Sequence, residues 1–208
     1  LLIECGVHFK EIQKALDFQT NKLTACLITH SHGDHCKGLK TVVQRGIDVF
    51  MTKEEYEATG VESHRIKHIE PLKHFKVGTW TILPFPTEHD TPNPVGYLIQ
   101  NAAAERLLFV TDSYYIRYKF ERVNIMAIEC NYDTQTLESN VSNGLHRAHA
   151  YRVMKSHMSL ETLLEFFKAN DLSRVEEIHL LHLSDSNANE TYIKQAVARA
   201  TGKPVFTP

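Results

Sequence analysis

The segment 30–35 reads His-Ser-His-Gly-Asp-His, and it constrains the fold of this chain more than any other stretch. It follows an apolar run at 23–28, which is typical of a buried strand. Alternate residues leaving a strand point the same way, so His30 and His32 can converge on one point. The sequence therefore predicts a strand end that presents imidazoles to a common ligand.

A second pair of polar side chains, Asp34 and His35, follows Gly33. Glycine allows a sharp turn, which would bring this pair to a point beside the first. Imidazole and carboxylate groups are ligands for zinc, manganese and iron. Two convergent points predict two divalent metal ions, and we expect Zn²⁺ or Mn²⁺.

Size and composition limit the remaining possibilities. With 208 residues, of which 42% are hydrophobic, the chain can bury one sizeable core, so we expect a single domain over residues 1–208. The formal net charge of −2 argues against wholesale electrostatic attraction to nucleic acid, although it is compatible with a local basic groove. The sequence has no run of about 18 apolar residues and no recognisable signal peptide, so we expect no membrane span.

The four cysteines form no CxxC pair. Cys5, Cys26 and Cys130 lie in apolar, strand-like runs, where small buried thiols are common. Cys36 directly follows His35 and could approach a metal. This usage predicts a reducing compartment, a cytoplasmic location and no disulfide framework.

Hydrophobic periodicity predicts a mixture of strands and helices. Strands are expected at 1–5, 23–29, 48–52, 80–88, 95–100, 106–111, 123–130 and 178–183, and helices at 7–18, 36–44, 53–59, 159–169 and 187–200. The polar segment 131–155 is expected to be irregular, and Asn187 with Glu190 to form a capping box. Two batches of strands, each followed by helices, agree with sheets packed together and helices outside.

The pattern His-x-His-x-Asp-His resembles the metallo-β-lactamase superfamily. This resemblance implies an α+β fold, the four-layer αββα sandwich, with metals at one sheet edge. The chain begins at Leu1 without Met, so we expect that N-terminal residues, including one or more strands of the fold, precede it.

Three later residues fall where the superfamily places its remaining ligands: His89, Asp112 and His182, each at the end of an expected strand. The resemblance implies that the first ion is bound by His30, His32, His89 and Asp112, and the second by Asp34, His35, Asp112 and His182. Two ions roughly 3.5–4 Å apart lower the pKa of a bridging water toward about 7 and supply hydroxide. That chemistry suits hydrolysis of an ester, a lactam or a phosphodiester.

Two features bear on the substrate class. The resemblance puts Asp112 at the bridging position, where the authentic β-lactamases typically have cysteine, and this favours the thioesterase and phosphodiesterase branches. The segment 156–159, Ser-His-Met-Ser, is similar to a motif of the nuclease branches, in which a glutamate holds an extra histidine near the scissile phosphate. Here these residues are His157 and Glu129. The implied catalytic residues are therefore His157 as general acid, Glu129 as its partner and Asp34 as a guide for the proton of the attacking water.

The resemblance is closest to the single-domain YycJ/WalJ-like nuclease branch, and it covers nearly the whole chain. It implies a nuclease, an exonuclease, acting on DNA rather than RNA. A rim of basic and aromatic residues could contact phosphates: Tyr114, Arg117, Lys119, Arg147, Arg152 and Lys155. An ordinary solvated charged surface explains the same residues equally well.

Two other functions remain open at this stage. A small-molecule hydrolase of the glyoxalase II or lactonase type would use the same ligands and would not need His157. A catalytically idle metal-binding module would act through partners.

Overall fold

The computed structural model describes residues 1–207, which form two compact units. The first unit comprises Leu1–Pro86 and Thr91–Val95, and the second comprises Thr87–Asp90 and Gly96–Pro208. The chain thus leaves the first unit, returns to it briefly and leaves it again. The expectation of a single domain stays a prediction.

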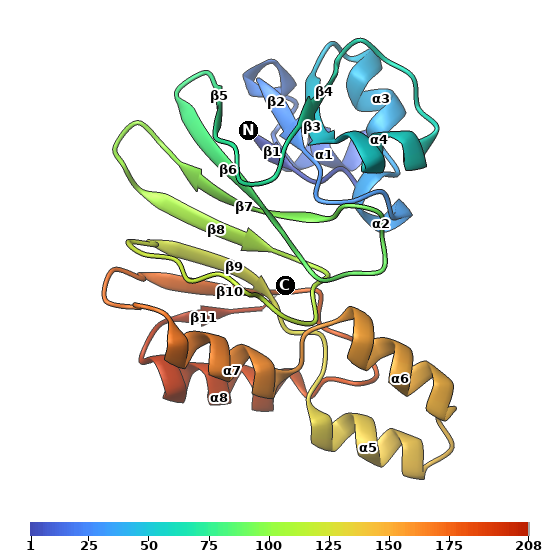
Figure 1. Cartoon of the computed structure of the whole chain (residues 1–208), viewed down its shortest axis with the longest axis vertical. Coiled ribbons are helices and arrows are strands. Elements are labelled where there is room, and N and C mark those ends of the chain that lie inside the picture. Colours follow the sequence, from blue (N-terminus) through green and yellow to red (C-terminus); the bar gives the residue numbers. More distant parts are fainter. Residues whose placement is uncertain (208) are drawn as a thin grey trace. The chain divides into compact units, whose positions relative to one another are not determined.

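The first unit is built on a four-stranded parallel sheet in the order β1-β2-β3-β4 (Figure 1). The strands are β1 (Leu2–Ile3), β2 (Ala25–Leu27), β3 (Asp48–Thr52) and β4 (Ile66–Ile69). The helices are α1 (Phe9–Ala15), the 3₁₀ turn η1 (Thr20–Lys22), α2 (Gly33–Cys36), α3 (Leu39–Gln44) and α4 (Lys53–Thr59). An antiparallel hairpin of β5 (Phe75–Val77) and β6 (Trp80–Pro86) completes the unit.

The core of this unit lies between the sheet and helices α1 and α3. Val49 and Met51 from β3 pack in one cluster with Ile12 of α1 and Val42 of α3, and all four side chains are buried. Parallel strands buried on both faces read as continuous apolar runs, and β2 is buried at every position. The chain leaves β2 and β3 at the same edge of the sheet because the two strands are parallel.

The second unit contains strands in the order β11-β10-β9-β8-β7. These are β7 (Val95–Gln100), β8 (Arg106–Val110), β9 (Ile125–Glu129), β10 (Glu177–Leu181) and β11 (Val205–Phe206). Its helices are α5 (Thr134–Ser142), α6 (Arg147–Ser156), α7 (Leu160–Ala169) and α8 (Glu190–Thr201). Only the β7–β8 pair is antiparallel among these strands. The carboxyl ends of β8, β9 and β10 therefore lie along one edge.

The sequence-based expectation for 131–155 was wrong. This segment forms α5 and α6, which pack against each other as a helical pair (Figure 1). The contact is a small apolar cluster made by Leu137, Ala150 and Val153 with their neighbours. Each helix has only a few apolar residues, so the hydrophobic pattern of the sequence gives little indication of a helix. Packing of the two helices against each other, rather than helix propensity, supplies most of their stability.

Two local expectations also differ from the structure. The last helix is capped by Asn189, whose side chain accepts a hydrogen bond from the Tyr192 amide, and not by Asn187. Gly33 opens α2 without a positive φ, and a Cβ there would have nothing within 4 Å. Across the described residues 1–207, none of the helices combines the length and apolar character required to cross a bilayer.

The glycine that the histidine segment requires is Gly6. A Cβ at Gly6 would lie 1.4 Å from the carbonyl oxygen of Asp34, so the backbone of α2 rests directly on it. The neighbouring Cys5 amide donates to the His35 carbonyl at 2.8 Å and fixes the same approach. The end of β1 thus sets the position of α2.

We expect Gly6→Ala to destabilise the protein by about 3 kcal/mol or more, because overpacking against backbone cannot be relieved by a side-chain rotation. Gly33→Ala is the matched control, since its Cβ enters open space. Urea denaturation measures both variants. Equal midpoints for the two would contradict the close approach at Gly6.

Candidate metal centre

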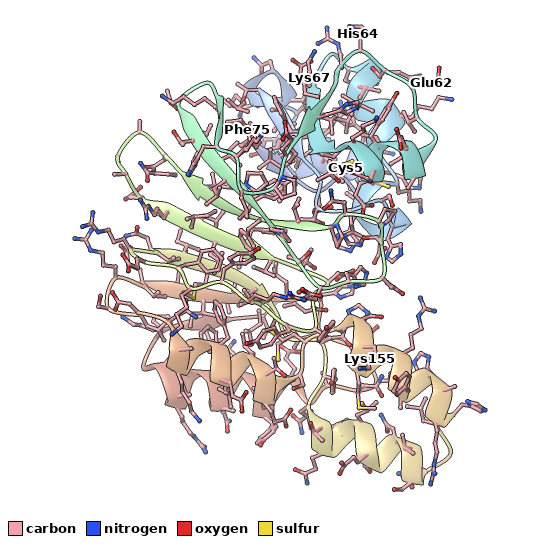
Figure 2. The ribbon with its side chains drawn as sticks, in the orientation of Figure 1. Cys5, Glu62, His64, Lys67, Phe75 and Lys155 are labelled. Carbon is pink, nitrogen blue, oxygen red and sulfur yellow. The ribbon has the colours of Figure 1, made fainter. Side chains whose placement is uncertain are left out.

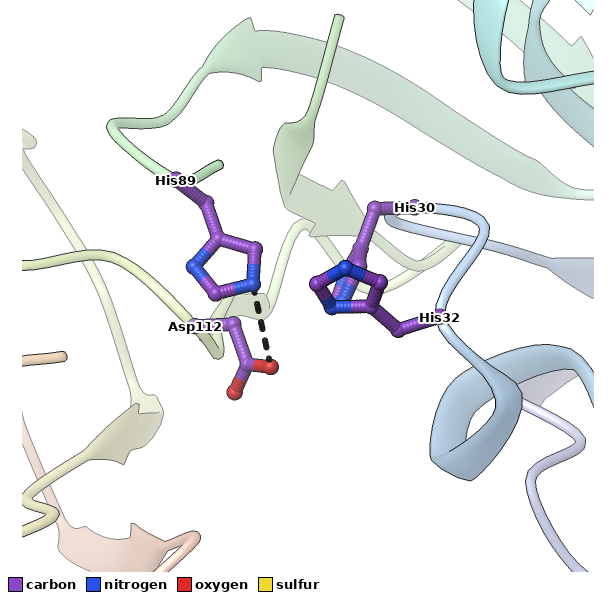
Figure 3. A group of neighbouring side chains, drawn as sticks. All are labelled: His30, His32, His89 and Asp112. Carbon is purple, nitrogen blue, oxygen red and sulfur yellow. Dashed lines mark ion pairs between the residues drawn. The ribbon is translucent and has the colours of Figure 1, made fainter. Parts of the chain in front are cut away.

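In the first unit, three imidazoles gather after β2. The ring centroids of His30 and His32 are 4.9 Å apart, and those of His30 and His35 are 4.2 Å apart (His30 and His32 are drawn in Figure 3). His30 and His35 are buried, whereas the Asp34 side chain is 64% exposed, with its Oδ2 atom 3.5 Å from Nε2 of His35. The expected convergence of His30 and His32 is present, and His35 joins them.

A partly buried carboxylate holds this group from behind. Glu4 accepts a hydrogen bond from the Thr29 amide at 2.9 Å, and its second oxygen lies 3.3 Å from Nδ1 of His35. The Thr29 hydroxyl lies 2.9 Å from Nδ1 of His30. Metal-binding histidines commonly engage one ring nitrogen in such a contact and use the other as ligand. The donor set and its surroundings therefore fit a metal.

Sequence reasoning missed a second carboxylate, Glu55 in α4, which was placed in a short acidic helix. Glu55 is fully buried and accepts hydrogen bonds from the amides of Ser31 and Asn93, each at 2.8 Å. Ser31 lies between the two ligand candidates His30 and His32. The sequence could not indicate that Glu55 is buried, because the neighbouring residue, Glu54, has the same side chain and is exposed.

Cys36 does not join the imidazoles as a ligand candidate. Its thiol donates to the Ser31 carbonyl at 3.0 Å. Burial raises the pKa of this thiol to about 11, with nearby acidic groups adding to the effect. The thiol is thus held in its neutral form.

In the second unit, His89 is oriented by the end of α6. Its Nδ1 atom contacts the Ser156 carbonyl at 2.9 Å. A carbonyl can only accept, so Nδ1 carries a proton, and in the neutral ring Nε2 holds the lone pair. Nε2 lies 3.6 Å from Oδ2 of Asp112, and both side chains are 2% exposed (Figure 3). His89 is therefore prepared to act as a metal ligand through Nε2.

Four side chains come together at the ends of β8, β9 and β10 and at the end of α6. One ligand atom from each lies within 4.8 Å of the others, and the group could hold a metal ion: Asp112, Glu129, His157 and His182. Nδ1 of His182 lies 2.9 Å from Oδ1 of Asp112, and Nδ1 of His157 lies 2.7 Å from Oε1 of Glu129. The expected contact between His157 and Glu129 is thus present.

Glu129 is the centre of this group. It is fully buried, and its Oε2 atom accepts hydrogen bonds from the amides of Ser113 at 2.8 Å and Met158 at 3.4 Å. These two amides belong to the residues that follow Asp112 and His157. One carboxylate therefore fixes both neighbouring segments.

The backbone at the site is strained. Asp112 has φ 48° and His182 has φ 55°, and such left-handed conformations are uncommon outside glycine. Glu4, behind His35, has φ 65°. Strain of about 1–3 kcal/mol for each such residue persists only where the surroundings enforce it, and it concentrates at functional sites.

The carboxylates also favour positive charge at His182. Burial alone would lower the pKa of this imidazole, but its hydrogen bonds with Asp112 and Glu129 raise the pKa to about 10. The charges of the same two carboxylates act in the same direction. The position beside Asp112 and Glu129 therefore stabilises a cation.

The basic rim lies in the second unit, on α6 and in the loop after β8. Two of its cations already have acidic partners beside His89: Arg117 lies 2.5 Å from Glu88, and Arg152 lies 3.9 Å from Asp90. These two arginines therefore help to hold the segment that carries His89.

Two sheets with flanking helices, and imidazole and carboxylate clusters at their strand ends, define a metallohydrolase. Residues 1–180 match the sequence model of the beta-lactamase superfamily domain, and the chain belongs to this family. Its predicted fold class is thereby confirmed.

Individual relatives agree with this assignment. The exodeoxyribonuclease WalJ of Streptococcus pneumoniae is 27% identical, over 90% of this chain and 74% of that protein. The exodeoxyribonuclease YycJ of Bacillus anthracis is 25% identical, over 66% of this chain and 56% of that protein. The metallo-beta-lactamase fold protein YhfI from Bacillus subtilis aligns with a TM-score of 0.70 at 16% identity, over 99% of this chain and 83% of that one, which shows the fold. With its family, these relatives identify the chain as a metal-dependent hydrolase.

We expect Glu55→Ala to lower the free energy of unfolding by about 2–5 kcal/mol, because two buried amides lose their acceptor. The same variant should retain less bound metal, since Ser31 would no longer be fixed between His30 and His32. Chemical denaturation and elemental analysis of the purified protein measure the two effects.

Glu54→Ala is the control for this experiment. Glu54 is exposed, and its carboxylate accepts from the Asn93 side chain at 2.9 Å. It should unfold and bind metal as the unaltered protein does. Equal losses in both variants would show that Glu55 has no special role.

Proposed function

We propose that this protein is a dinuclear-metal-dependent phosphodiesterase, an exonuclease acting on DNA. The observation that carries the proposal is the hydrogen bond between His157 and the buried Glu129, beside Asp112 and His182. Metal binding alone does not require this extra histidine, whereas the departure of an alkoxide from phosphorus benefits from a proton donor. The names of the two exodeoxyribonuclease relatives support the same substrate class.

The proposed metal ligands come from both units, which would then form one domain. The first ion is assigned to His30, His32, His89 and Asp112, and the second to Asp34, His35, Asp112 and His182. The nitrogen and oxygen donors suit Zn²⁺ or Mn²⁺. When bound, two such ions lower the pKa of a coordinated water and offset charge on the attacked group.

His157 is the proposed general acid. Because a carboxylate accepts, the 2.7 Å contact with Glu129 places the proton of Nδ1 on that side. Nε2 is then the nitrogen left to protonate or stabilise the departing oxygen. Glu129 acts through His157 as a positioning residue. The amides of Ser113 and Met158 donate to its Oε2 atom and fix the carboxylate, so that the carboxylate in turn fixes the orientation of the imidazole.

Asp34 is proposed to steer the proton of the attacking water. Its side chain is the most exposed in the first-unit group, so it can meet solvent and substrate. A cytoplasmic location and a preference for DNA over RNA are part of the proposal.

The proposal is tested with end-labelled DNA and added Mn²⁺ or Zn²⁺. We expect shortening of the label-bearing strand that disappears in Asp34→Ala. His157→Ala should lower the rate by about 10²–10⁴-fold, the usual contribution of a general acid, while bound metal is unchanged. The fragment pattern over time gives the polarity of cleavage.

His64→Ala is the control, because His64 is an exposed histidine of the first unit (labelled in Figure 2). It should leave the rate unaltered. Undiminished turnover in metal-loaded His157→Ala would refute the general-acid role. A metal-loaded protein that cleaves neither DNA nor RNA would instead favour the small-molecule hydrolases.

Chelation should destabilise the protein. A ligand that binds only the folded state at about 1,000 times its Kd adds about 4 kcal/mol of stability, so EDTA should lower the melting temperature and Zn²⁺ or Mn²⁺ should restore it. Asp34→Ala should respond less than the unaltered protein. A melting temperature that is indifferent to EDTA, in protein shown by elemental analysis to start with metal, would contradict the proposed site.

A further inference from the structure

Helix α6 carries a concentrated positive charge in a chain whose formal net charge is −2. Its sequence, Arg-Ala-His-Ala-Tyr-Arg-Val-Met-Lys-Ser, contains three cations and no acidic residue. Figure 2 marks one of these cations, Lys155, on the helix. A local excess of positive charge of this kind can neutralise the phosphates of a polyanion.

The two sides of α6 differ sharply. Ala150, Val153 and Ser156 are buried, the first two in the cluster shared with α5. Three residues spaced four apart lie in one row on the exposed side: Arg147, Tyr151 and Lys155. Packing against α5 therefore leaves an aromatic ring between two cations in solvent.

Tyr151 lies at the centre of this row and is 60% exposed. The Lys155 ammonium is 5.8 Å from the centre of its ring. A ring with a cation beside it offers a platform for a base together with a partner for the adjoining phosphate.

Helix α6 ends at the candidate active centre. Ser156, the last residue of α6, accepts the hydrogen bond of His89, and the next residue is His157. A strand bound along α6 would therefore lead to the residues assigned to phosphodiester cleavage. Arg152, on the same helix, is directed to Asp90 and is less suited to hold the strand.

We propose that α6 binds single-stranded nucleic acid, with one base stacked on Tyr151 and phosphates neutralised by Arg147 and Lys155. This inference rests on the proposed function and names the substrate class of the same site. Stacking needs an unpaired base, so the surface favours a single strand or a frayed end over an intact duplex. Neither contact reads sequence.

The test measures binding without turnover. Fluorescence anisotropy follows a labelled single-stranded oligodeoxynucleotide with phosphorothioate linkages, which resist hydrolysis, added to the metal-loaded protein. Tyr151→Ala should weaken binding about fivefold or more, the usual loss for one stacked base. Tyr151→Phe keeps the ring and should keep the affinity. Tyr192→Ala, which removes an exposed tyrosine of α8, is the matched control and should bind as the unaltered protein does.

Salt dependence tests the cations separately. Arg147→Gln and Lys155→Gln should each reduce the slope of log affinity against log salt by about 0.7, the value for one phosphate contact on a single strand. In steady-state cleavage of the ordinary oligonucleotide, Tyr151→Ala should raise KM and leave kcat unchanged. A structural role of the ring would instead lower kcat or the melting temperature.

Three results would overturn the inference. The first is an unaltered affinity of Tyr151→Ala for the single strand, and the second is a loss of affinity in Tyr151→Phe equal to that in Tyr151→Ala. The third is that Tyr151→Ala loses as much affinity for a blunt, cross-linked duplex as it does for the single strand. Other results would refute the proposed nuclease function without refuting the role of α6, and the reverse is also possible. Binding that depends on Tyr151 without any cleavage would refute the nuclease alone. Cleavage with binding indifferent to Tyr151 would refute the role of α6 alone.

Discussion

Largely buried carboxylates must be satisfied by hydrogen-bond donors, and in this protein the donors belong to the segments that carry the histidines. Glu4 accepts from the residue before His30, Glu55 from the residue after it, and Glu129 from the residue after Asp112. Removing any of these donors would leave a largely buried carboxylate oxygen with one hydrogen bond fewer, which is unfavourable. The interior thus requires the same loop conformations that a metal site requires.

This requirement explains how the strained backbone is maintained. Asp112 and His182 occupy the left-handed region, which a free loop would leave. Glu129 bonds the amide next to Asp112, and the side-chain amide of Asn131 donates to the carbonyl of His182 at 2.8 Å. Both contacts come from the end of β9, the strand between β8 and β10. The central strand therefore holds its two neighbours in conformations that direct a carboxylate and an imidazole to a common point.

The sequence was informative where chemistry is dense and local. His30 and His32 could be placed on one side of a strand end because period-two geometry needs no partner, and the long apolar strands were also predicted. The short strands β4 and β5 were missed, because they lie in a segment rich in polar residues. Glu55 could not be found, because nothing in Lys-Glu-Glu-Tyr distinguishes the buried glutamate from the exposed one. The sequence predicted that Gly33 is needed for a sharp turn, but the glycine that the structure requires is Gly6, which lies against the backbone of Asp34. This contact joins residues that are far apart in the sequence. Long-range contacts of this kind leave no periodic trace, so the family resemblance could supply ligands but not the residues that hold them.

The error at 131–155 bears most directly on function. Helices α5 and α6 have few apolar residues because each needs only enough to hold the other, and the remaining positions are available for a different purpose. On α6 those positions carry cations and an exposed ring, and the helix ends at the residue that orients His89. The first turn of α6 carries Arg147 and no acidic residue, an arrangement that the helix dipole disfavours, and the proposed contact with a polyanion would offset this cost.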